Sequence, residues 1–575
     1  MKLMKIKAIL FAASLLILTA QSCDKFLEEE LISDVSASSY YTTAAGLEDA
    51  VDASYHWLKW IHSNERAHSL TIFGTDTYTN GADGGHKSFN YYDNGLNSSS
   101  SQIEEMWEYL YKGINQCNAV LNRSEAITDM DPALLEIRRA EVRFLRAYYY
   151  FILVQQWGSV HLTLEETEGA QVEANKTPEA EIYSQAIVPD LEFAIATLPA
   201  EQSDYGRATK PAAEFILGKA LLTRGWKSFG SAADFTAAEA LFTSVIENYD
   251  FALQPTMTDL WDQDNQINSE IIFAVQYSPD LILNGSEGNR SHLYFLMEYD
   301  VRPGMIRDIQ NGRPFKRFRL TEYMLDVWGK DRDIDARYDQ TYKHAWISNN
   351  PLSIPAWTAE NVAAGAKNAD GTPAVAGQPK YQVGDTAIFI PGPGREAEWT
   401  PQKRLQTRYA VYLTNEYTER VFAHTGKFID PRRPSIQWEA GSRDWFIARL
   451  ADAYISRAEA RFKLGDLPGA ATDINVVRAR AAQPGKEADM MITDADVTLD
   501  FILEERAREF DAEQCRWYDL TRTGTLVERV RAYNPEGAGN IEDYHVHRPI
   551  PQTQLDRTLG GYEQNCGYPG GPSCN

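Results

Sequence analysis

Helical periodicity in two separate blocks constrains the fold of this sequence more than any other feature. Apolar residues recur at helical spacing between about residues 44 and 251, and again between about 445 and 530. Long amphipathic helices are predicted in the first block at 103–121, 133–157, 180–198, 211–229 and 237–249. The fold class that follows is mainly α.

Small residues at matching places indicate that these helices pair like tetratricopeptide repeats. Ala458 is followed by Gly465 and then by Ala470, so two antiparallel helices can approach closely on either side of a glycine turn. Gly218 and Ala238 occupy similar places in a second pair. The helices expected near 140–157 and 180–198 form a third. Several such pairs predict a scaffold of stacked helical repeats.

The stretch between the blocks has a different pattern. Residues 271–275 predict a short strand, and 321–328 predict a short helix. Segments 349–394 and 80–101 are rich in residues such as Gly and Asn, and predict long loops. Long loops in compact proteins are usually functional or disordered.

These patterns divide the chain into regions of one compact unit. We expect an irregular, loop-rich, ligand-binding region at 259–442, packed on the helical scaffold. A helical repeat region at 23–258 precedes it, and a helical repeat region with a tail, 443–575, follows it.

The amino end has the features of a secretory signal. Lys2, Lys5 and Lys7 precede an apolar run at 8–18 that is too short to span a bilayer, and small residues follow the run. We predict a signal peptide at 1–22, with a short amino-terminal anchor as the alternative. Later segments are too short or too polar to span a membrane.

Cys23 directly follows this predicted signal. The preceding residues, Ala20-Gln21-Ser22, form a loose lipobox, which predicts a lipid on the sulfur of Cys23. Stable anchoring needs more than one acyl chain. The alternative is a plain secreted protein with a free Cys23.

Composition narrows the possible partners. A net charge of −25 makes nucleic acid a poor partner. The 13 Trp and 30 Tyr suit stacking on sugars, but they suit a helical core equally well. Five Cys are too few to build the fold from disulfides. Cys566 and Cys574 flank a turn-rich loop that would allow them to pair, although free thiols are equally compatible with the sequence.

Three stretches far apart in the chain resemble one family. They are 18–28, which includes Cys23; 140–158, which begins Ala-Glu-Val-Arg-Phe-Leu-Arg-Ala-Tyr-Tyr-Tyr-Phe; and 504–522, which ends Arg-Trp-Tyr-Asp-Leu-Thr-Arg. Together they resemble the SusD/RagB family of outer-membrane nutrient-binding lipoproteins. The resemblance covers nearly the whole chain, but His161 and Cys566 stand where the family usually has proline.

The resemblance implies a location and partners. It implies a lipoprotein of the outer membrane, and the acidic residues after Cys23 resemble a signal that places such proteins on the cell exterior. The implied partner is a SusC-like TonB-dependent transporter, to which the protein would deliver an oligomeric nutrient, either a glycan or a peptide. The membrane contact would be the lipid alone, and no cofactor is implied.

Loop residues are the candidate ligand contacts, because loops carry function while helical aromatics mostly fill the core. The candidates are Asp76, Tyr78, Asn80, His86, Phe89, Tyr91, Tyr92, Asn94, Tyr294, Phe295, Tyr299, Arg302, Arg313, Trp346, Trp357 and Trp399. We expect segment 78–94 to line a cleft with 294–299. The alternative is that these rings fasten the loops to the scaffold.

Charged residues of the 504–522 motif have a structural interpretation. Six charged residues recur at helical spacing, where opposite charges can pair: Glu505, Arg506, Arg508, Glu509, Arg516 and Asp519. We predict a packed charge network and not an active site, because structural ion pairs are the commoner cause of such clusters.

Two other functions remain open at this point. One is a repeat scaffold that binds only proteins, because repeats by themselves specify no ligand. The other is a secreted glycoside hydrolase, which would need two suitably spaced carboxylates. No Gly-x-Ser-x-Gly or His-Glu-x-x-His motif occurs. Asp262, Asp264 and Asn265 alternate but lack the Gly and distal Glu of an EF-hand, so no metal site is predicted.

Overall fold

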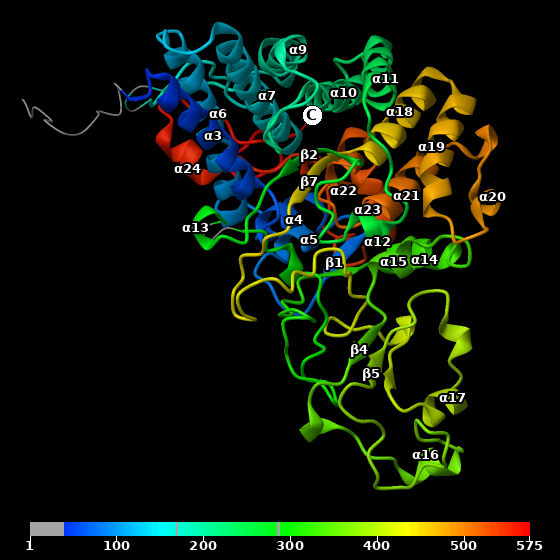
Figure 1. Cartoon of the computed structure of the whole chain (residues 1–575). Coiled ribbons are helices and arrows are strands. Elements are labelled where there is room, and N and C mark those ends of the chain that lie inside the picture. The colour runs from blue at the N-terminus through cyan, green and yellow to red at the C-terminus, as the bar shows by residue number, and fades with distance from the viewer. Residues whose placement is uncertain (1–39, 168, 170, 285–287, 575) are drawn as a thin grey trace, which may run out of the picture.

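A curved array of antiparallel helices forms the upper half of the molecule (Figure 1). The computed structural model describes residues 40–574 except 168, 170 and 285–287. Each helix of the array packs on the next one in the order α3 (Ala44–Ile61), α6 (Ser101–Ser124), α7 (Pro132–Trp157), α9 (Val188–Thr197), α10 (Lys210–Trp226), α11 (Ala232–Glu247), α18 (Leu450–Leu464) and α19 (Leu467–Ala481). The prediction of a mainly helical, repeat-like scaffold is confirmed.

Local sequence sets the ends of these helices. Asp131 accepts hydrogen bonds from the backbone N–H groups of Ala133 and Leu134 at the start of α7. Gly465, with φ +85°, ends α18 in the left-handed conformation that glycine adopts without strain. The helix expected at 180–198 is divided into α8 (Glu179–Ile182), a π-helical turn (Tyr183–Ile187) and α9. We attribute the wide turn to Pro189, which has no N–H to donate within the helix.

Close approach between paired helices depends on the predicted small residues. A Cβ atom added to Gly218 of α10 would lie 2.8 Å from the ring of Phe242 on α11. Ala458 of α18 and Ala470 of α19 are fully buried between their helices. The larger side chains around them fill the remaining space, as close packing in a protein interior requires.

Small sheets join distant parts of the chain below the array. β1 (Tyr78–Asn80) pairs antiparallel with β3 (Phe318–Leu320), with Tyr78 opposite Leu320. β2 (Ile271–Val275) is the predicted strand, and it pairs antiparallel with β7 (Trp445–Arg449). Residues 445–449 were expected to begin the second helical block. They form a strand because their partner is β2, which lies far away in the sequence.

A lobe rich in loops projects below the array (Figure 1). It contains the three-stranded sheet of β4 (Ala345–Ile347), β5 (Thr386–Phe389) and β6 (Ala410–Val411). A small core of its own includes Met297, Trp346 and Ile388. The helix expected at 321–328 is α14 (Glu322–Lys330), which lies between this lobe and the array (Figure 1).

The remaining helices are short or complete the carboxyl-terminal part. They are α4 (Glu65–Thr71), α5 (Ser88–Tyr91), α12 (Met257–Leu260), α13 (Leu281–Asn284), α15 (Arg337–Thr341), α16 (Ala359–Ala363), α17 (Pro401–Gln406), α20 (Glu487–Met490), α21 (Leu499–Glu509), α22 (Arg516–Arg522), α23 (Leu526–Tyr533) and α24 (Gln552–Arg557).

A buried charge network holds α21 and α22 in place. Arg337 has no exposed side-chain area and contacts Glu505 at 2.9 Å and Glu509 at 3.0 Å. Arg506 contacts Asp519 at 2.8 Å. Burial by itself would raise the pKa of Glu505, but Arg337 and neighbouring arginines lower that pKa to about 2. The structure thus shows the network predicted from the spacing.

The predicted signal peptide, Cys23 and the acidic residues after it lie outside the described residues. Within residues 40–574, apart from the gaps given above, no helix is long and apolar enough to cross a membrane.

Candidate functional site

Most of the predicted ligand contacts are buried, and this corrects their assignment. Side chains of this group are at most 9% exposed: Asp76, Tyr78, Asn80, Phe89, Tyr92, Tyr294, Phe295, Tyr299, Trp346, Trp357 and Trp399. A ligand cannot reach them in this structure, so 78–94 and 294–299 do not form an open aromatic cleft. The rings fasten the loops to the scaffold, which was the alternative.

Packing of the loop rings on one another is the physical reason. The Phe295 ring lies 5.4 Å from the ring of Tyr78 and 5.5 Å from that of Phe318, between ring centroids. The β1–β3 pairing brings Tyr78 and Phe318 onto neighbouring strands, although they are more than two hundred positions apart in the sequence. Tyr92 points inward and donates from its hydroxyl to the carbonyl of Gly74, at 2.7 Å. An aromatic ring in a loop that lies near a scaffold has a lower free energy when it is buried against the scaffold than when it is exposed to water.

Asp76 is an internal anchor of the first loop. Its carboxylate lies 2.6 Å from Arg516 on α22 and 2.6 Å from Arg529 on α23. Burial by itself would raise the pKa of Asp76, but the two guanidinium groups hold it below its ordinary value. The three lobe tryptophans, Trp346, Trp357 and Trp399, lie in three separate small cores.

Five predicted contacts remain accessible: His86, Tyr91, Asn94, Arg302 and Arg313. Ion pairs connect the segments that carry most of them. His86 contacts Glu65 at 3.0 Å, and Glu65 also contacts Arg317 at 2.6 Å. Glu298 contacts Arg302 at 3.6 Å and Arg420 at 2.7 Å.

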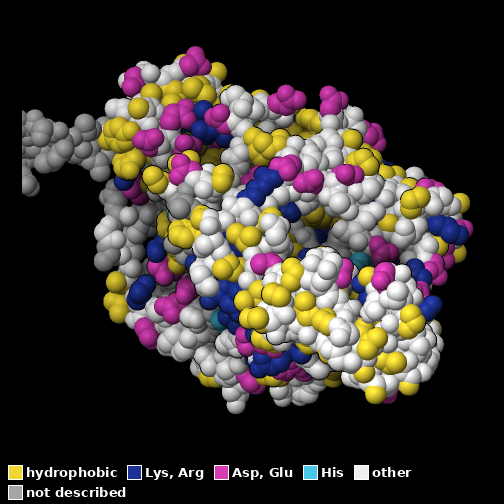
Figure 2. All heavy atoms as spheres, turned by 60° about the horizontal axis from the view of Figure 1, so that its bottom comes forward, with side chains coloured by type: hydrophobic (Ala, Val, Ile, Leu, Met, Phe, Trp, Pro, Cys, Tyr) yellow, Lys and Arg dark blue, Asp and Glu magenta, His cyan; other side chains and the backbone are white. Residues whose placement is uncertain are grey.

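Arginine guanidinium groups lie over two aromatic rings on this surface. The guanidinium groups of Arg313 and Arg317 each lie 5.0 Å from the centroid of the Phe315 ring. Arg302 lies 6.0 Å from the centroid of Tyr412. We call the surface formed by His86, Tyr91, Arg302, Arg313, Phe315 and Tyr412 the loop face. Figure 2 views the molecule with the lobe forward, and Lys and Arg side chains gather beside the lobe there.

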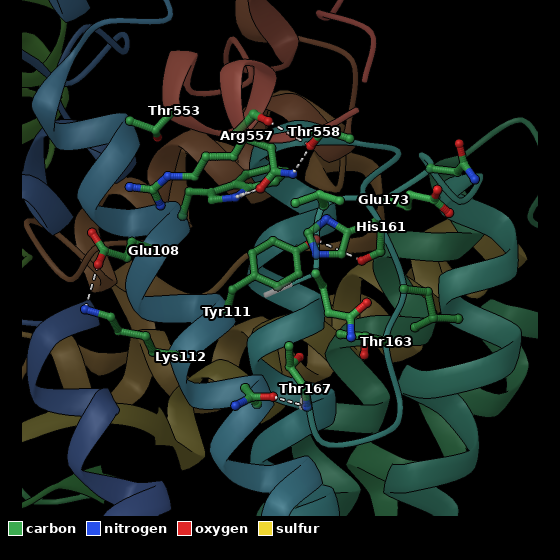
Figure 3. Close-up of a pocket in the computed structure, with 18 of the residues that line it drawn as sticks. Glu108, Tyr111, Lys112, His161, Thr163, Thr167, Glu173, Thr553, Arg557 and Thr558 are labelled. Atoms are coloured by element: carbon green, nitrogen blue, oxygen red, sulfur yellow. Dashed lines mark hydrogen bonds and ion pairs between the residues drawn. The ribbon is translucent and has the colours of Figure 1, made fainter. Parts of the chain in front are cut away.

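A concave region elsewhere on the molecule was not predicted from the sequence. It is a groove of 1170 Å³ between α6, the segments 161–167 and 171–177, and α24, and Figure 3 shows it in close-up. Glu108, Tyr111 and Lys112 of α6 line it, while Thr553, Arg557 and Thr558 line it from the α24 side. Ligand sites of drug size are about 300–1,000 Å³, so this groove is large enough for an extended ligand.

Tyr111 and His161 lie at the middle of the groove. Their rings stack with centroids 4.0 Å apart and planes 6° apart (Figure 3). The Tyr111 hydroxyl donates to the backbone carbonyl of His161 at 2.8 Å. Burial lowers the pKa of His161 to about 4, so its imidazole is neutral at pH 7. The helical position of Tyr111 suggested a core residue, which is why the groove was missed. His161, standing where the family usually has proline, was the available signal.

Cysteine pairing is resolved at the carboxyl end. Cys566 and Cys574 form a disulfide, with Cα atoms 5.0 Å apart. Cys117 is buried as a free thiol, and Cys515 is partly buried. Among the described residues, no group of three or more His, Cys, Asp or Glu side chains is placed to hold a metal ion.

Comparison with known families identifies the chain. A model described as "SusD family" matches residues 269–568, and a model described as "Starch-binding associating with outer membrane" matches residues 25–222. The fold is thus a helical repeat scaffold with a loop-rich lobe, matched by family models in both halves. The chain belongs to the SusD family.

Relatives match over different lengths. "SusD-like protein P25" of Formosa agariphila is 24% identical, covering 95% of this chain and 98% of that protein. "Starch-binding protein SusD" of Bacteroides thetaiotaomicron is 26% identical, covering 82% and 80%. The match to a "SusD-like protein" of Bacteroides ovatus, 29% identical, covers 48% of this chain and only 50% of that protein.

Solved structures show the same fold. A "Laminarin binding SusD-like protein" superposes with a TM-score of 0.62 at 21% identity, covering 92% of this chain and all of that one. "Surface glycan-binding protein A" of Bacteroides thetaiotaomicron, in complex with laminarihexaose, has a TM-score of 0.62 at 19% identity, covering 91% of this chain and 99% of that one.

Proposed function

We propose that this protein is a cell-surface lipoprotein that captures an oligomeric nutrient, most suitably a glycan, and delivers it to a SusC-like TonB-dependent transporter. The supporting observation is family membership along both halves of the chain. Relatives that share the fold are named for binding starch, laminarin or surface glycans. The assignment is a binding role without catalysis or cofactor.

The loop face is the proposed primary ligand surface. It offers the half-buried ring of Tyr91 and the arginine-flanked ring of Phe315. Aromatic faces pack against the C–H faces of sugars, and guanidinium groups donate to hydroxyl oxygens in fixed directions. Regions 23–258 and 443–575 would supply the scaffold, and region 259–442 most of the ligand surface.

The carboxylates of the 504–522 motif are not placed to act as a glycosidase pair. Glu505, Glu509 and Asp519 are each held by arginines inside the protein, away from any substrate. A glycosidase needs two carboxyl groups facing one sugar from opposite sides. Incubating the purified protein with starch and laminarin should release no reducing sugar, while the same protein should bind at least one neutral glycan. Sugar release at enzymatic rates would reject the proposal.

Lipidation at Cys23, with signal peptide cleavage after residue 22, is the proposed means of anchoring. Replacing Cys23→Ala should move the protein from the membrane to the soluble fraction, because the lipid is the proposed anchor. The test should use cells that lack the transporter, and the membrane fraction should be washed with high salt. Retention of the variant in the membrane would place the anchor elsewhere.

A transporter barrel is the proposed partner. It should co-purify with the native chain from outer membranes in mild detergent, and it should be identified by mass spectrometry. A repeat scaffold without a small ligand is the second candidate function, supported by the helical array itself. Co-purification together with failure of the purified chain to bind any glycan or peptide would favour the scaffold.

A further inference from the structure

We infer that the groove of Figure 3 is a second carbohydrate site, on the helical array and separate from the loop face, which takes a neutral oligosaccharide of several units. The inference rests on the proposed function for the class of ligand. It is carried by the shape of the groove, the charge of its walls and an aromatic strip at its rim.

Side chains of the walls favour a neutral polyol. Hydroxyl and amide groups come from several elements, including Thr163, Thr177, Asn175 and Thr553. Such groups both donate and accept hydrogen bonds, as sugar hydroxyls do. Aliphatic lining is limited to Leu162, Val172 and Ala174, so an apolar helix or strand has little to bury against.

Charge on the walls argues against an anionic ligand. The lining carries the carboxylates of Glu104, Glu108, Glu165, Glu166 and Glu173. Its cations are Lys112 and Arg557, and Lys112 is paired with Glu108 at 2.6 Å. Glu166 is paired with Arg123, which lies outside the lining, so the remaining carboxylates still outnumber the cations. Sulfated or uronic glycans would meet a net negative surface, which repels them. A neutral sugar avoids this repulsion and can donate hydroxyl protons to the carboxylates.

An aromatic strip continues from the rim of the groove. Trp57 of α3 lines the groove, and its ring stacks on Tyr109 of α6 with centroids 6.0 Å apart and planes 26° apart. Trp60 follows, with its ring centroid 4.8 Å from that of Tyr109. These three side chains are only partly buried, although each sits on a helix. Arg66 and Lys112 also lie over the Tyr109 ring, 4.8 Å and 5.5 Å from its centroid. A chain of sugar units that left the groove would therefore meet the rings of Trp57 and Trp60.

Binding measurements on matched variants test the site. Isothermal titration would use neutral hexasaccharides, namely β-1,3-, β-1,4- and α-1,4-glucans and a mannan. Asn175 is exposed, so Asn175→Trp should obstruct the groove without disturbing the fold. Trp60→Ala removes a ring of the strip. Phe229→Ala is the control, because Phe229 is an exposed ring, 39% accessible, that does not line the groove. Tyr91→Ala tests the loop face separately.

We expect Asn175→Trp to abolish one glycan-binding event. Trp60→Ala should weaken that event by about 2- to 10-fold, the range expected for one stacked ring, while the control changes nothing.

Unchanged affinity and stoichiometry in both groove variants would overturn this inference. If Tyr91→Ala alone weakened binding, the proposed function would stand without the groove site. If the native chain bound no glycan, both would fail. Loss of the transporter from Asn175→Trp, with sugar binding intact, would make the groove a protein interface and overturn the inference.

Discussion

Aromatic rings in the loops and aromatic rings on helices α3 and α6 differ in a way that local sequence does not indicate. Phe295 and Tyr92 lie in loop-rich segments, yet they are 2% and 3% exposed. Trp57, Trp60 and Tyr109 lie on helices, yet they are partly open to solvent and pack on one another. The general rule that loops carry the binding rings and helices bury theirs would assign both groups wrongly.

Helix geometry and loop placement explain the difference. Helices α3 and α6 each bury one face, and the opposite face stays open whatever residues stand on it. A loop has no fixed faces, so the surface on which it lies decides which rings turn inward. Here the β1–β3 pairing and the Asp76 anchor press the loops onto the scaffold. The exposed rings of the array therefore become candidates for binding.

Removing the loop anchor should have the largest effect. Asp76→Ala leaves Arg516 and Arg529 without their shared buried carboxylate. Loss of one partner of a buried ion pair costs about 3–5 kcal/mol of unfolding free energy. Urea denaturation would measure it. Asp500→Ala is the control, because Asp500 pairs with the same Arg529 but its side chain is 84% exposed, so a loss of about 0–1 kcal/mol is expected. Equal effects would show that the loop is not anchored from inside.

Tyr92 and Tyr91 are neighbours in one loop, but Tyr92 is buried and Tyr91 is only half-buried. Tyr92→Ala should lower the unfolding free energy by about 3 kcal/mol, because it leaves a cavity where the ring was packed. Tyr92→Phe should cost only about 1 kcal/mol, through the lost hydrogen bond to Gly74. Thermal melts with calorimetry would separate the variants. If Tyr92→Ala had the same unfolding free energy as the native protein, the Tyr92 ring would not be part of the core.

Acid should weaken the buried charge network that holds α21 and α22 in place. The pKa values of Glu505 and Asp519 are each about 2 in the folded protein, below their ordinary values of about 4. Because these pKa values are lowered, the stabilisation is present above pH 4 and is lost as the pH falls toward 2. Each group contributes about 3 kcal/mol by linkage. Urea midpoints measured between pH 6 and pH 2.5 should fall over the acidic part. A flat profile would contradict the ion pairing, and Asp519→Asn should reduce the slope.

Tyr91 should show the smallest effect on stability. Its side chain is half-buried, so Tyr91→Ala should change the unfolding free energy by about 1 kcal/mol or less. Glycan binding at the loop face should weaken by about 2- to 10-fold, as for the loss of one stacked ring. Titration with the neutral hexasaccharides measures it. A large loss of stability with unchanged binding would place Tyr91 with Tyr92 in the core.

The sequence predicted correctly those features that depend on residues close together in the chain. Helical periodicity located α6, α7, α10 and α11 within a few residues, and the spacing of Glu505 to Asp519 indicated a packed charge network. It was less successful for the ligand contacts. The burial of Tyr78 depends on Phe295 and on its strand partner Leu320, which stand more than two hundred residues away. No local pattern contains that information.

Helix positions, the paired small residues and family membership were therefore decided along the chain, because caps, periodicity and motifs act over a few residues. Tertiary structure alone decided which rings are accessible. Burial of an aromatic ring depends on what packs against it, and in this protein those neighbours come from distant strands and helices. The groove at Tyr111 and His161 exists for the same reason, since α6, the segments 161–167 and 171–177, and α24 meet only in the folded chain.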